Sequence, residues 1–376
     1  FSIPVAQRFG AGDHHGLRCF VANAGWLSAI FSAVMTIIVC FLCMDILRWM
    51  DTPDDIIQGA YDYIFIIFAG IPVTYLYNIL AGIIRSLGDS RTPVYFLLLS
   101  SVINIFLDLF TILVMGMGVE GAAYATVISQ AISGVLCFLY MRSHFPILRM
   151  TREERKFNLR MAKILCGIGI PMGLQYSITA IGSVILQTAV NGLGSLYVAA
   201  ISAGNKLTLF FTCPFEALGA TMATWAGQNV GAGKIDRVKE GVKYALLIGC
   251  VYAVAAFVIL TLFSKYLALL FLDADEVSTI GNVSLFLFGN SLFYIALVFV
   301  NVVRFSIQGM GFSTFAILAG VFEMFARTFA GMCLVPIFGY PAACFASPMA
   351  WIAADIFLVP AFLHCIKKLK KMFSVI

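Results

Sequence analysis

Long apolar runs separated by short polar connections are the main pattern of this chain. An α-helix that crosses a membrane needs roughly twenty mostly apolar residues. A transmembrane β-barrel would instead show segments near ten residues with alternating polarity, and the sequence shows no such alternation. The pattern therefore predicts an all-α integral membrane protein. The predicted spans are 19–44, 56–84, 93–115, 119–141, 166–191, 196–225, 243–271, 280–305, 313–335 and 341–364.

The composition supports the same class of protein. Of the 376 residues, 61% are hydrophobic and 11% are charged, whereas a soluble domain is about half apolar and about a quarter charged. A globular core of this size could not bury so much apolar surface, so the solvent must be lipid. The formal net charge of +5 gives no indication of nucleic-acid binding, and we expect no nucleic-acid partner.

The polar connections alternate in sign along the chain. About twenty of the 24 Lys and Arg residues fall on one side, including Arg304 and the run from Arg142 to Lys163. The acidic stretches "DTPDD" at 51–55 and "DADE" at 273–276 fall on the other side. Because excess Lys and Arg mark the cytoplasmic face, we expect a multi-pass plasma-membrane protein whose long basic linker and carboxy terminus are cytoplasmic.

The two halves of the chain resemble each other weakly. Three pairs of segments match in the same order, at one spacing of about 221–223 residues. The pairs are "AQRFGAG" (6–12) with "GQNVGAG" (227–233), Asn78 with Asn301, and "GVEGAAYAT" (118–126) with "GYPAACFAS" (339–347). The sequence therefore predicts a tandem duplication with both halves oriented alike. By the same spacing, roughly sixty residues are expected before Phe1.

The duplication predicts two lobes joined by a linker. We expect an amino-terminal lobe at 1–141, containing the end of the second helix and helices three to six. The cytoplasmic linker is expected at 142–161, and the carboxy-terminal lobe with helices seven to twelve at 162–376.

The order of five motifs resembles the multidrug and toxic compound extrusion (MATE) family over essentially the whole chain. The motifs are AQxxGAG, "RSLGDSRTP", "NIFLDLF", "GVEGAAYAT" and "GQNVGAG". The resemblance implies a twelve-span fold of two pseudo-symmetric six-helix lobes, here without the first helix and most of the second. It also implies a monomer in membrane lipid that exports small organic cations or amphiphilic drugs in exchange for H⁺ or Na⁺, with no other cofactor.

One branch of the family carries acids in the seventh and tenth helices, where they are used for Na⁺. The corresponding helices of this chain, 169–190 and 288–308, contain no Asp or Glu. The resemblance therefore favours the DinF-like branch, whose ion site lies in the first lobe.

An aspartate inside an apolar span is the main candidate for ion coupling. Asp108 follows Asn104 by one helical turn, so both should project from one face, and a buried charge is a functional candidate by default. Thr126 on the next helix has comparable depth, and Asn78 is a further candidate. These oxygen-bearing side chains could hold a proton or Na⁺, the one metal expected here. The alternative is a static hydrogen-bonded contact between two helices. The resemblance implies the functional role, together with an aspartate on the missing first helix.

The second lobe differs from the first at the equivalent positions. By the repeat spacing, Asn104 falls on Arg327 and Asp108 on Gly331. Glu323 and Arg327 are four residues apart and are predicted to form a structural ion pair. The candidates for lining a substrate cavity are Gln175, Tyr176, Gln187, Glu216 and Lys206.

Three alternatives to antiport remain open. A flippase of lipid-linked saccharides, from the same superfamily, would need a row of cationic residues in the cavity. An intramembrane enzyme would need a catalytic set of acids or metal ligands within the spans. The four histidines all lie in or beside the cytoplasmic segments, so we expect no enzyme. The third alternative is a truncated remnant that does not transport.

Overall fold

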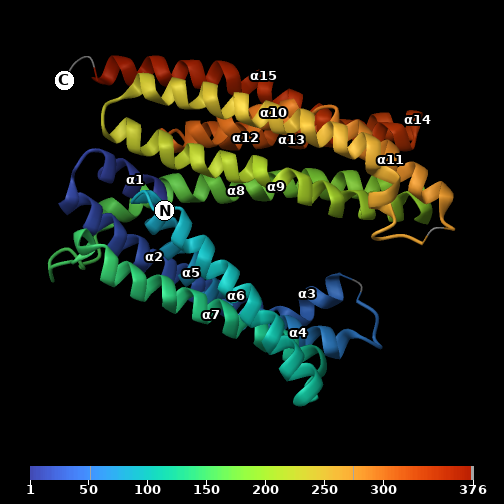
Figure 1. Cartoon of the computed structure of the whole chain (residues 1–376), viewed down its shortest axis with the longest axis horizontal. Coiled ribbons are helices and arrows are strands. Elements are labelled where there is room, and N and C mark those ends of the chain that lie inside the picture. The colour runs from blue at the N-terminus through green and yellow to red at the C-terminus, as the bar shows by residue number, and fades with distance from the viewer. Residues whose placement is uncertain (51, 274, 374–376) are drawn as a thin grey trace. The chain divides into compact units, whose positions relative to one another are not determined.

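The computed structural model describes residues 1–50, 52–273 and 275–373, and every regular element in this part of the chain is a helix (Figure 1). Eight of these helices are long and apolar enough to cross a membrane, and two bent pairs bring the total to as many as ten spans. This confirms the predicted all-α membrane fold. Asp51 and Ala274, one in each acidic connection, lie outside the described residues, as do 374–376 of the predicted second lobe.

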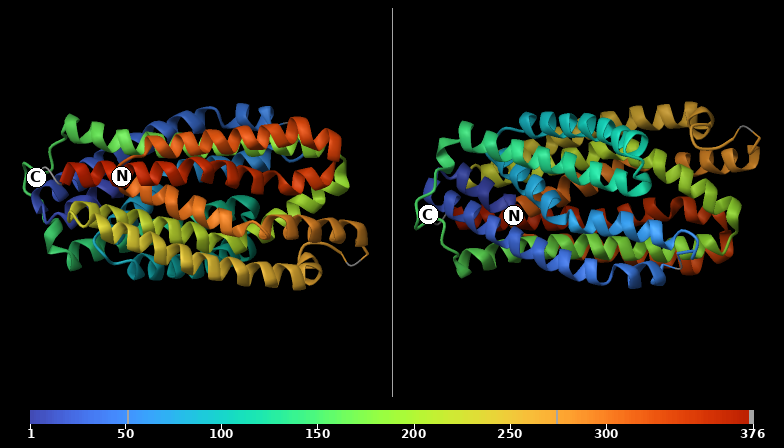
Figure 2. Two further views of the ribbon diagram at one scale, coloured as in Figure 1. Left: turned by 90° about the horizontal axis from the view of Figure 1, so that it is seen from above. Right: turned by 90° about the horizontal axis from the view of Figure 1, so that it is seen from below.

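The chain divides into two compact units, Phe1–Cys166 and Gly167–Ile376. Within each unit the helices run side by side along a common direction (Figure 2). The boundary falls inside α8 (Leu159–Asn191). The segment 142–161, expected as a linker, belongs to the first unit, and its Leu148 lies in the same buried cluster as Leu17 and Leu165.

The first unit is built from short and long helices in sequence. They are α1 (Ser2–Gly10), α2 (His14–Phe41), α3 (Cys43–Trp49), α4 (Ile57–Ala69), α5 (Ile71–Ser86), α6 (Arg91–Leu109), the π-helical turn η1 (Phe110–Val114), α7 (Gly118–His144) and the 3₁₀ turn η2 (Pro146–Leu148). Asp13 begins α2 by accepting a hydrogen bond from the Gly16 amide at 2.8 Å, as an N-cap residue does.

The second unit contains most of α8 and the helices that follow. They are α9 (Ser195–Gly231), α10 (Ile235–Ala268), α11 (Val277–Ser291), α12 (Tyr294–Gly309), α13 (Thr314–Phe329), the π-helical turn η3 (Ala330–Leu334), α14 (Val335–Phe338) and α15 (Tyr340–Phe373). Several helices extend beyond the apolar runs that predicted them, because polar residues at their ends continue the helix.

Backbone irregularities recur in the two units at the spacing of the sequence repeat. The span of α4 and α5 bends by 41° and that of α11 and α12 by 48°. The first bend lies just before Pro72, whose missing N–H suits the first turn of a helix. The π-helical turns η1 and η3 begin 220 residues apart. Bends and π-turns have local causes in sequence, so their recurrence supports the predicted duplication.

Glycines in left-handed conformation mark the same turns in both units. Gly12 and Gly233 have φ of 69° and 71°, and they lie 221 residues apart. Gly118 and Gly339 have φ of 59° and 64° at the same spacing. A side chain would be strained in this region of φ, which explains why glycine occurs at these positions of the matching motifs.

Candidate functional site

Asp108 and Asn104 lie one turn apart on α6, as their spacing predicts. Both side chains are half-buried. The Asp108 Oδ1 and Asn104 Nδ2 atoms are buried, and neither has a hydrogen-bond partner among the described residues. A buried carboxylate oxygen without a donor is costly, so a proton or a cation that reached it would be bound favourably.

The backbone changes its hydrogen bonding directly after Asp108. α6 gives way to the π-helical turn η1, a feature that often occurs at functional sites. Within it, the Thr111 hydroxyl donates to the Leu107 carbonyl at 2.8 Å. A Cβ on Gly121 would lie 2.9 Å from the Thr111 Cβ. Glycine at this position therefore allows α7 to approach η1 closely.

Thr126 lies on α7 and is half-buried. Its hydroxyl donates to the Ala122 carbonyl of its own helix at 2.9 Å. In the described part of the chain no hydrogen bond joins it to Asn104 or Asp108. The participation of Thr126 in one site with them therefore stays a prediction, although its hydroxyl oxygen keeps lone pairs that could face a cation.

A second polar contact joins α5 to α7. Asn78 is exposed and donates to the Thr74 carbonyl at 2.9 Å. The Thr74 hydroxyl in turn donates to the Gln130 side-chain oxygen. Thr74 and Gln130 were not among the candidates predicted from the sequence, yet Gln130 stands four residues after Thr126 and so on the same face of α7. That spacing was the signal that could have identified it.

In the second unit, the predicted pair of Glu323 and Arg327 is present. The Arg327 Nη1 atom lies 3.2 Å from the Glu323 Oε2 atom. Glu323 is 2% exposed and Arg327 is 6% exposed. A charge this deeply buried needs a partner, so the pairing explains how both residues are tolerated inside the helix bundle.

Arg304 is a third member of this group, and it lies in a helix instead of the connection where the sequence placed it, while its cytoplasmic side stays a prediction. It lies within α12, is 6% exposed, and donates to the Glu323 Oε1 atom. The helix continues five residues beyond it to Gly309, and α12 packs against α13 and α15. The position of a residue relative to the end of its apolar run cannot show whether neighbouring helices cover that residue.

Asp355 on α15 is a further buried acid that sequence reasoning missed. Its Oδ1 atom is buried without a hydrogen-bond partner among the described residues, as is the Nε atom of Arg304. Arg304 is also the charged group that acts on Asp355 electrostatically. A single carboxylate in the apolar run 350–362 is the same signal that identified Asp108, so it could have been found.

Gln175, a candidate for the substrate cavity, is buried in this conformation. Its side-chain oxygen accepts a hydrogen bond at 3.3 Å from the Gln308 side-chain nitrogen, and the two side chains are 2% and 0% exposed. The contact links α8 to α12. Gln187 is half-buried and donates to the Asn191 side chain at 2.9 Å. Their role in a cavity stays a prediction.

The remaining cavity candidates are exposed. Tyr176 is 57% exposed and lies within electrostatic reach of Glu216, which is also exposed. The Lys206 Nζ atom lies 5.4 Å from the centre of the Phe271 ring, a cation–π distance. Lys206 and Glu216 both lie on α9, where no ion pair joins them within the described ranges.

No group of three or more His, Cys, Asp or Glu side chains is placed to hold a metal ion in the part of the chain that the structure describes.

The helices and their buried charges define a multi-span membrane protein. The MatE family model matches residues 1–110 and 171–332, which is most of the chain. The chain belongs to this family, and the resemblance found in the sequence is confirmed. Assignment to the DinF-like branch stays a prediction.

Known relatives agree with this family. Two proteins of Bacillus subtilis (strain 168) are named probable multidrug resistance proteins. YoeA is 29% identical over 291 residues, 75% of this chain and 62% of its own. YpnP is 32% identical over 286 residues, 74% of this chain and 62% of its own. The match thus spans less than two thirds of either relative.

A solved structure shows the same fold. A crystal structure of MATE in complex with MaL6 superposes with a TM-score of 0.92 at 22% identity, covering 98% of this chain and 84% of that one.

Proposed function

We propose that this protein is a secondary active antiporter that exports organic cations or amphiphilic drugs in exchange for H⁺ or Na⁺ by alternating access. The observation that carries the proposal is the state of Asp108. Its carboxylate lies half-buried on a membrane-spanning helix, beside Asn104, with a buried oxygen that no described residue satisfies. An acid of this kind can exchange one cation for another, whereas a paired acid cannot do so without breaking its pair.

The coupling follows from a change of charge at one position. When Asp108 binds a proton, it loses its charge and gains a donor. The helices α6 and α7 then repack around it, with the π-helical turn η1 as the adaptable point. Exchange results only if the substrate binds the two protonation states with different affinity. In the Na⁺ version, the oxygens of Asp108, Asn104 and Thr126 are the ligands.

The substrate class rests on two observations. Both Bacillus relatives carry names that refer to multidrug resistance. In this chain, exposed Glu216 on α9 and the nearby ring of Tyr176 could attract a cationic or aromatic molecule. We further propose that the protein acts as a monomer in the plasma membrane.

A flippase of lipid-linked saccharides is the second candidate. The observation that favours it is the excess of cations around Glu323, where Arg304 and Arg327 share one carboxylate. An anionic headgroup would be attracted whenever Asp355 is neutral. Competition decides between the two: a cationic dye and a lipid pyrophosphate would be offered to the same reconstituted protein, and the proposal expects only the dye to be transported.

The test of the main proposal is Asp108→Asn in proteoliposomes with an imposed ion gradient. The variant keeps the shape of the side chain but cannot titrate, so folding should be preserved and gradient-driven export should fall by at least about a hundredfold, or about 2.7 kcal/mol. Asn104→Ala and Thr126→Ala should reduce export less, since each removes a neutral group.

The matched control is Asp62→Asn on α4. Asp62 accepts a hydrogen bond from the Gln58 side chain at 3.0 Å, so its carboxylate already has a partner, and its replacement should leave export unchanged. Export by Asp108→Asn at the normal rate, still dependent on the gradient, would refute the coupling role.

The proposed orientation has its own test. The linker and the carboxy terminus should be cytoplasmic, so a cysteine placed at position 153 in a cysteine-free background should react with an impermeant reagent only in inverted vesicles. Reaction from outside intact cells would reverse the orientation.

A further inference from the structure

A groove at the end of α7 combines arginines with an apolar wall. It is formed where the last turns of α7 meet the segment 145–155, and its volume is about 700 Å³. The lining residues are Phe138, Met141, Arg142, Phe145, Leu148, Arg149, Met150 and Arg155. All of them belong to the first unit. The groove is therefore amphipathic, with three cations and a continuous apolar surface.

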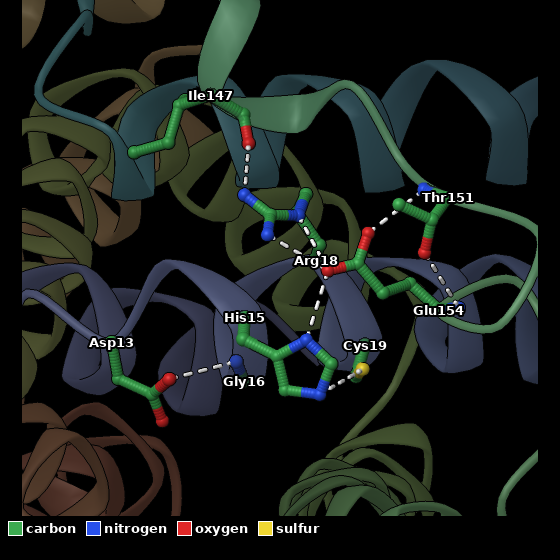
Figure 3. A network of polar contacts seen from close by, with 8 residues as sticks. All are labelled: Asp13, His15, Gly16, Arg18, Cys19, Ile147, Thr151 and Glu154. Atoms are coloured by element: carbon green, nitrogen blue, oxygen red, sulfur yellow. Dashed lines mark hydrogen bonds and ion pairs between the residues drawn. The ribbon is translucent and has the colours of Figure 1, made fainter.

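Within the described ranges, no acidic side chain neutralises the arginines of this groove. The two acids of the segment are turned to other partners. Glu154 is 3% exposed, and its Oε1 atom lies 2.8 Å from the Arg18 Nη2 atom and 2.9 Å from the His15 Nδ1 atom (Figure 3). Glu153 pairs with Lys156 at 2.8 Å. Among the described residues, the guanidinium groups that line the groove have no ion-pair partner.

The wall of the groove is held in place by α2. The Arg18 Nη1 atom donates to the Ile147 carbonyl at 3.4 Å, as Figure 3 shows. The Trp26 indole donates to the Arg155 carbonyl at 2.9 Å. The Asn158 amide donates to the Asn23 side chain at 2.8 Å. The segment is thus preorganised before any ligand arrives, which lowers the entropic cost of binding.

The apolar wall continues along a membrane-spanning helix. Val135 and Leu139 on α7 are 50% and 55% exposed, and they lie on the same helical face as Arg142 at intervals of seven and three residues. A molecule in the groove could therefore lay a hydrocarbon chain on α7 while its polar end meets the arginines. A free phosphate would leave this apolar surface unused.

We propose that the groove binds the headgroup of an anionic phospholipid, with an acyl chain along the exposed face of α7. Arginine binds phosphate oxygens through charge-assisted hydrogen bonds, and basic pockets beside membrane-spanning helices suit anionic headgroups. The lipid would join the end of α7 to the segment 145–155. The inference does not depend on antiport or on the identity of the substrate.

Native mass spectrometry of the whole protein tests the proposal. Phosphatidylglycerol and phosphatidylcholine with the same acyl chains would be titrated separately. The protein should retain phosphatidylglycerol at least about tenfold more tightly, since the phosphate of phosphatidylcholine is neutralised by its own ammonium group. Equal retention of the two lipids would refute the site.

Two double variants with the same loss of charge locate the binding. Arg142→Gln with Arg149→Gln removes two groove arginines, and phosphatidylglycerol binding should weaken by about tenfold or more. Arg160→Gln with Lys163→Gln removes two exposed charges at the start of α8, outside the groove, and binding should change by less than about twofold. Equal losses would show that the attraction is diffuse.

The source of the phosphate is tested by competition. Inorganic phosphate and glycerophosphate should not displace phosphatidylglycerol at equal concentration, and Phe138→Ala should weaken lipid binding without changing the charge. Displacement by inorganic phosphate, or full binding by the Phe138→Ala variant, would overturn the lipid assignment. Size-exclusion profiles of all variants should match that of the unmodified protein, because the replaced arginines are exposed.

Discussion

The helices α6 and α13 occupy equivalent places in the two units, but the acid on each helix has a different environment. Each helix ends in a π-helical turn, η1 or η3. On α6, Asp108 has a buried oxygen that no described residue satisfies. On α13, both oxygens of Glu323 are bound, one by Arg304 and one by Arg327.

The difference shows what decides the role of an acid in a membrane. An acid held by fixed cations keeps its charge and stabilises the packing of its helices. An acid without a fixed cation is available to a mobile one, which is the role we propose for Asp108. Both helices share the π-helical turn, so the arginines that meet Glu323, one on α12 and one four residues further along α13, are the distinguishing feature.

The largest expected effect is on folding of the second unit. Glu323→Gln leaves two buried guanidinium groups with no carboxylate between them, and breaking a buried pair in this way costs about 3–5 kcal/mol. We expect little monodisperse protein by size-exclusion chromatography. Glu216→Gln, an exposed change on α9, should cost less than about 0.5 kcal/mol. A well-folded Glu323→Gln variant that fails to transport would place the coupling acid in the second unit.

The comparison can be sharpened with a second buried acid. Asp355 resembles Asp108 in having a buried oxygen without a hydrogen bond among the described residues, but Arg304 acts on it electrostatically. We therefore expect Asp355→Asn to keep gradient-driven export within about threefold, or about 0.7 kcal/mol, when Asp108→Asn abolishes it. Export would be measured for both variants in one proteoliposome preparation. If both fail equally, the two units share the coupling.

An effect on stability smaller than that of Glu323→Gln is expected where α7 approaches η1. Gly121→Ala would place a Cβ 2.9 Å from that of Thr111, and overpacking of this kind costs about 1–3 kcal/mol. The midpoint of thermal unfolding should fall. The equivalent residue of the second unit is Ala342, which indicates that only the first unit needs the close approach.

Gly59→Ala on α4 is the control for this prediction, since the nearest atom to a Cβ there is 4.0 Å away. It should be neutral or slightly stabilising, because alanine favours a helix over glycine. An unchanged midpoint for Gly121→Ala would show that α6 and α7 can separate without cost.

The smallest effect concerns Glu154, an acid outside the spans. Like Glu323, it is held by an arginine. The Arg18 guanidinium, helped by the Thr151 amide, lowers the pKa of Glu154 from 4.5 to about 2. The stability from this contact is present in full above pH 4.5 and is lost as the pH falls through about 2. The midpoint of thermal unfolding would be measured for the His15→Gln variant with and without Glu154→Gln. The difference between the two midpoints should stay constant from pH 5 to 8. A difference that vanishes below pH 6 would contradict this assignment.

The sequence alone determined the class of fold, the pairing of Glu323 with Arg327, and the position of Asp108 inside an apolar span. The spans followed from the lengths of the apolar runs, because a bilayer sets those lengths. The pairing of Glu323 with Arg327 followed from a spacing of four residues, since an α-helix brings such residues together. Asp108 was identifiable because a lone carboxylate in an apolar run is costly wherever the helix lies.

Only the tertiary structure decided which distant residues meet. It brought Arg304 to Glu323 across two helices, joined Gln175 to Gln308, and turned Glu154 inward to Arg18 across 136 residues. Hydropathy and helical period report the neighbours of a residue along its own helix. The faces that helices present to one another depend on the simultaneous packing of many side chains from several helices. No single run of sequence contains that information.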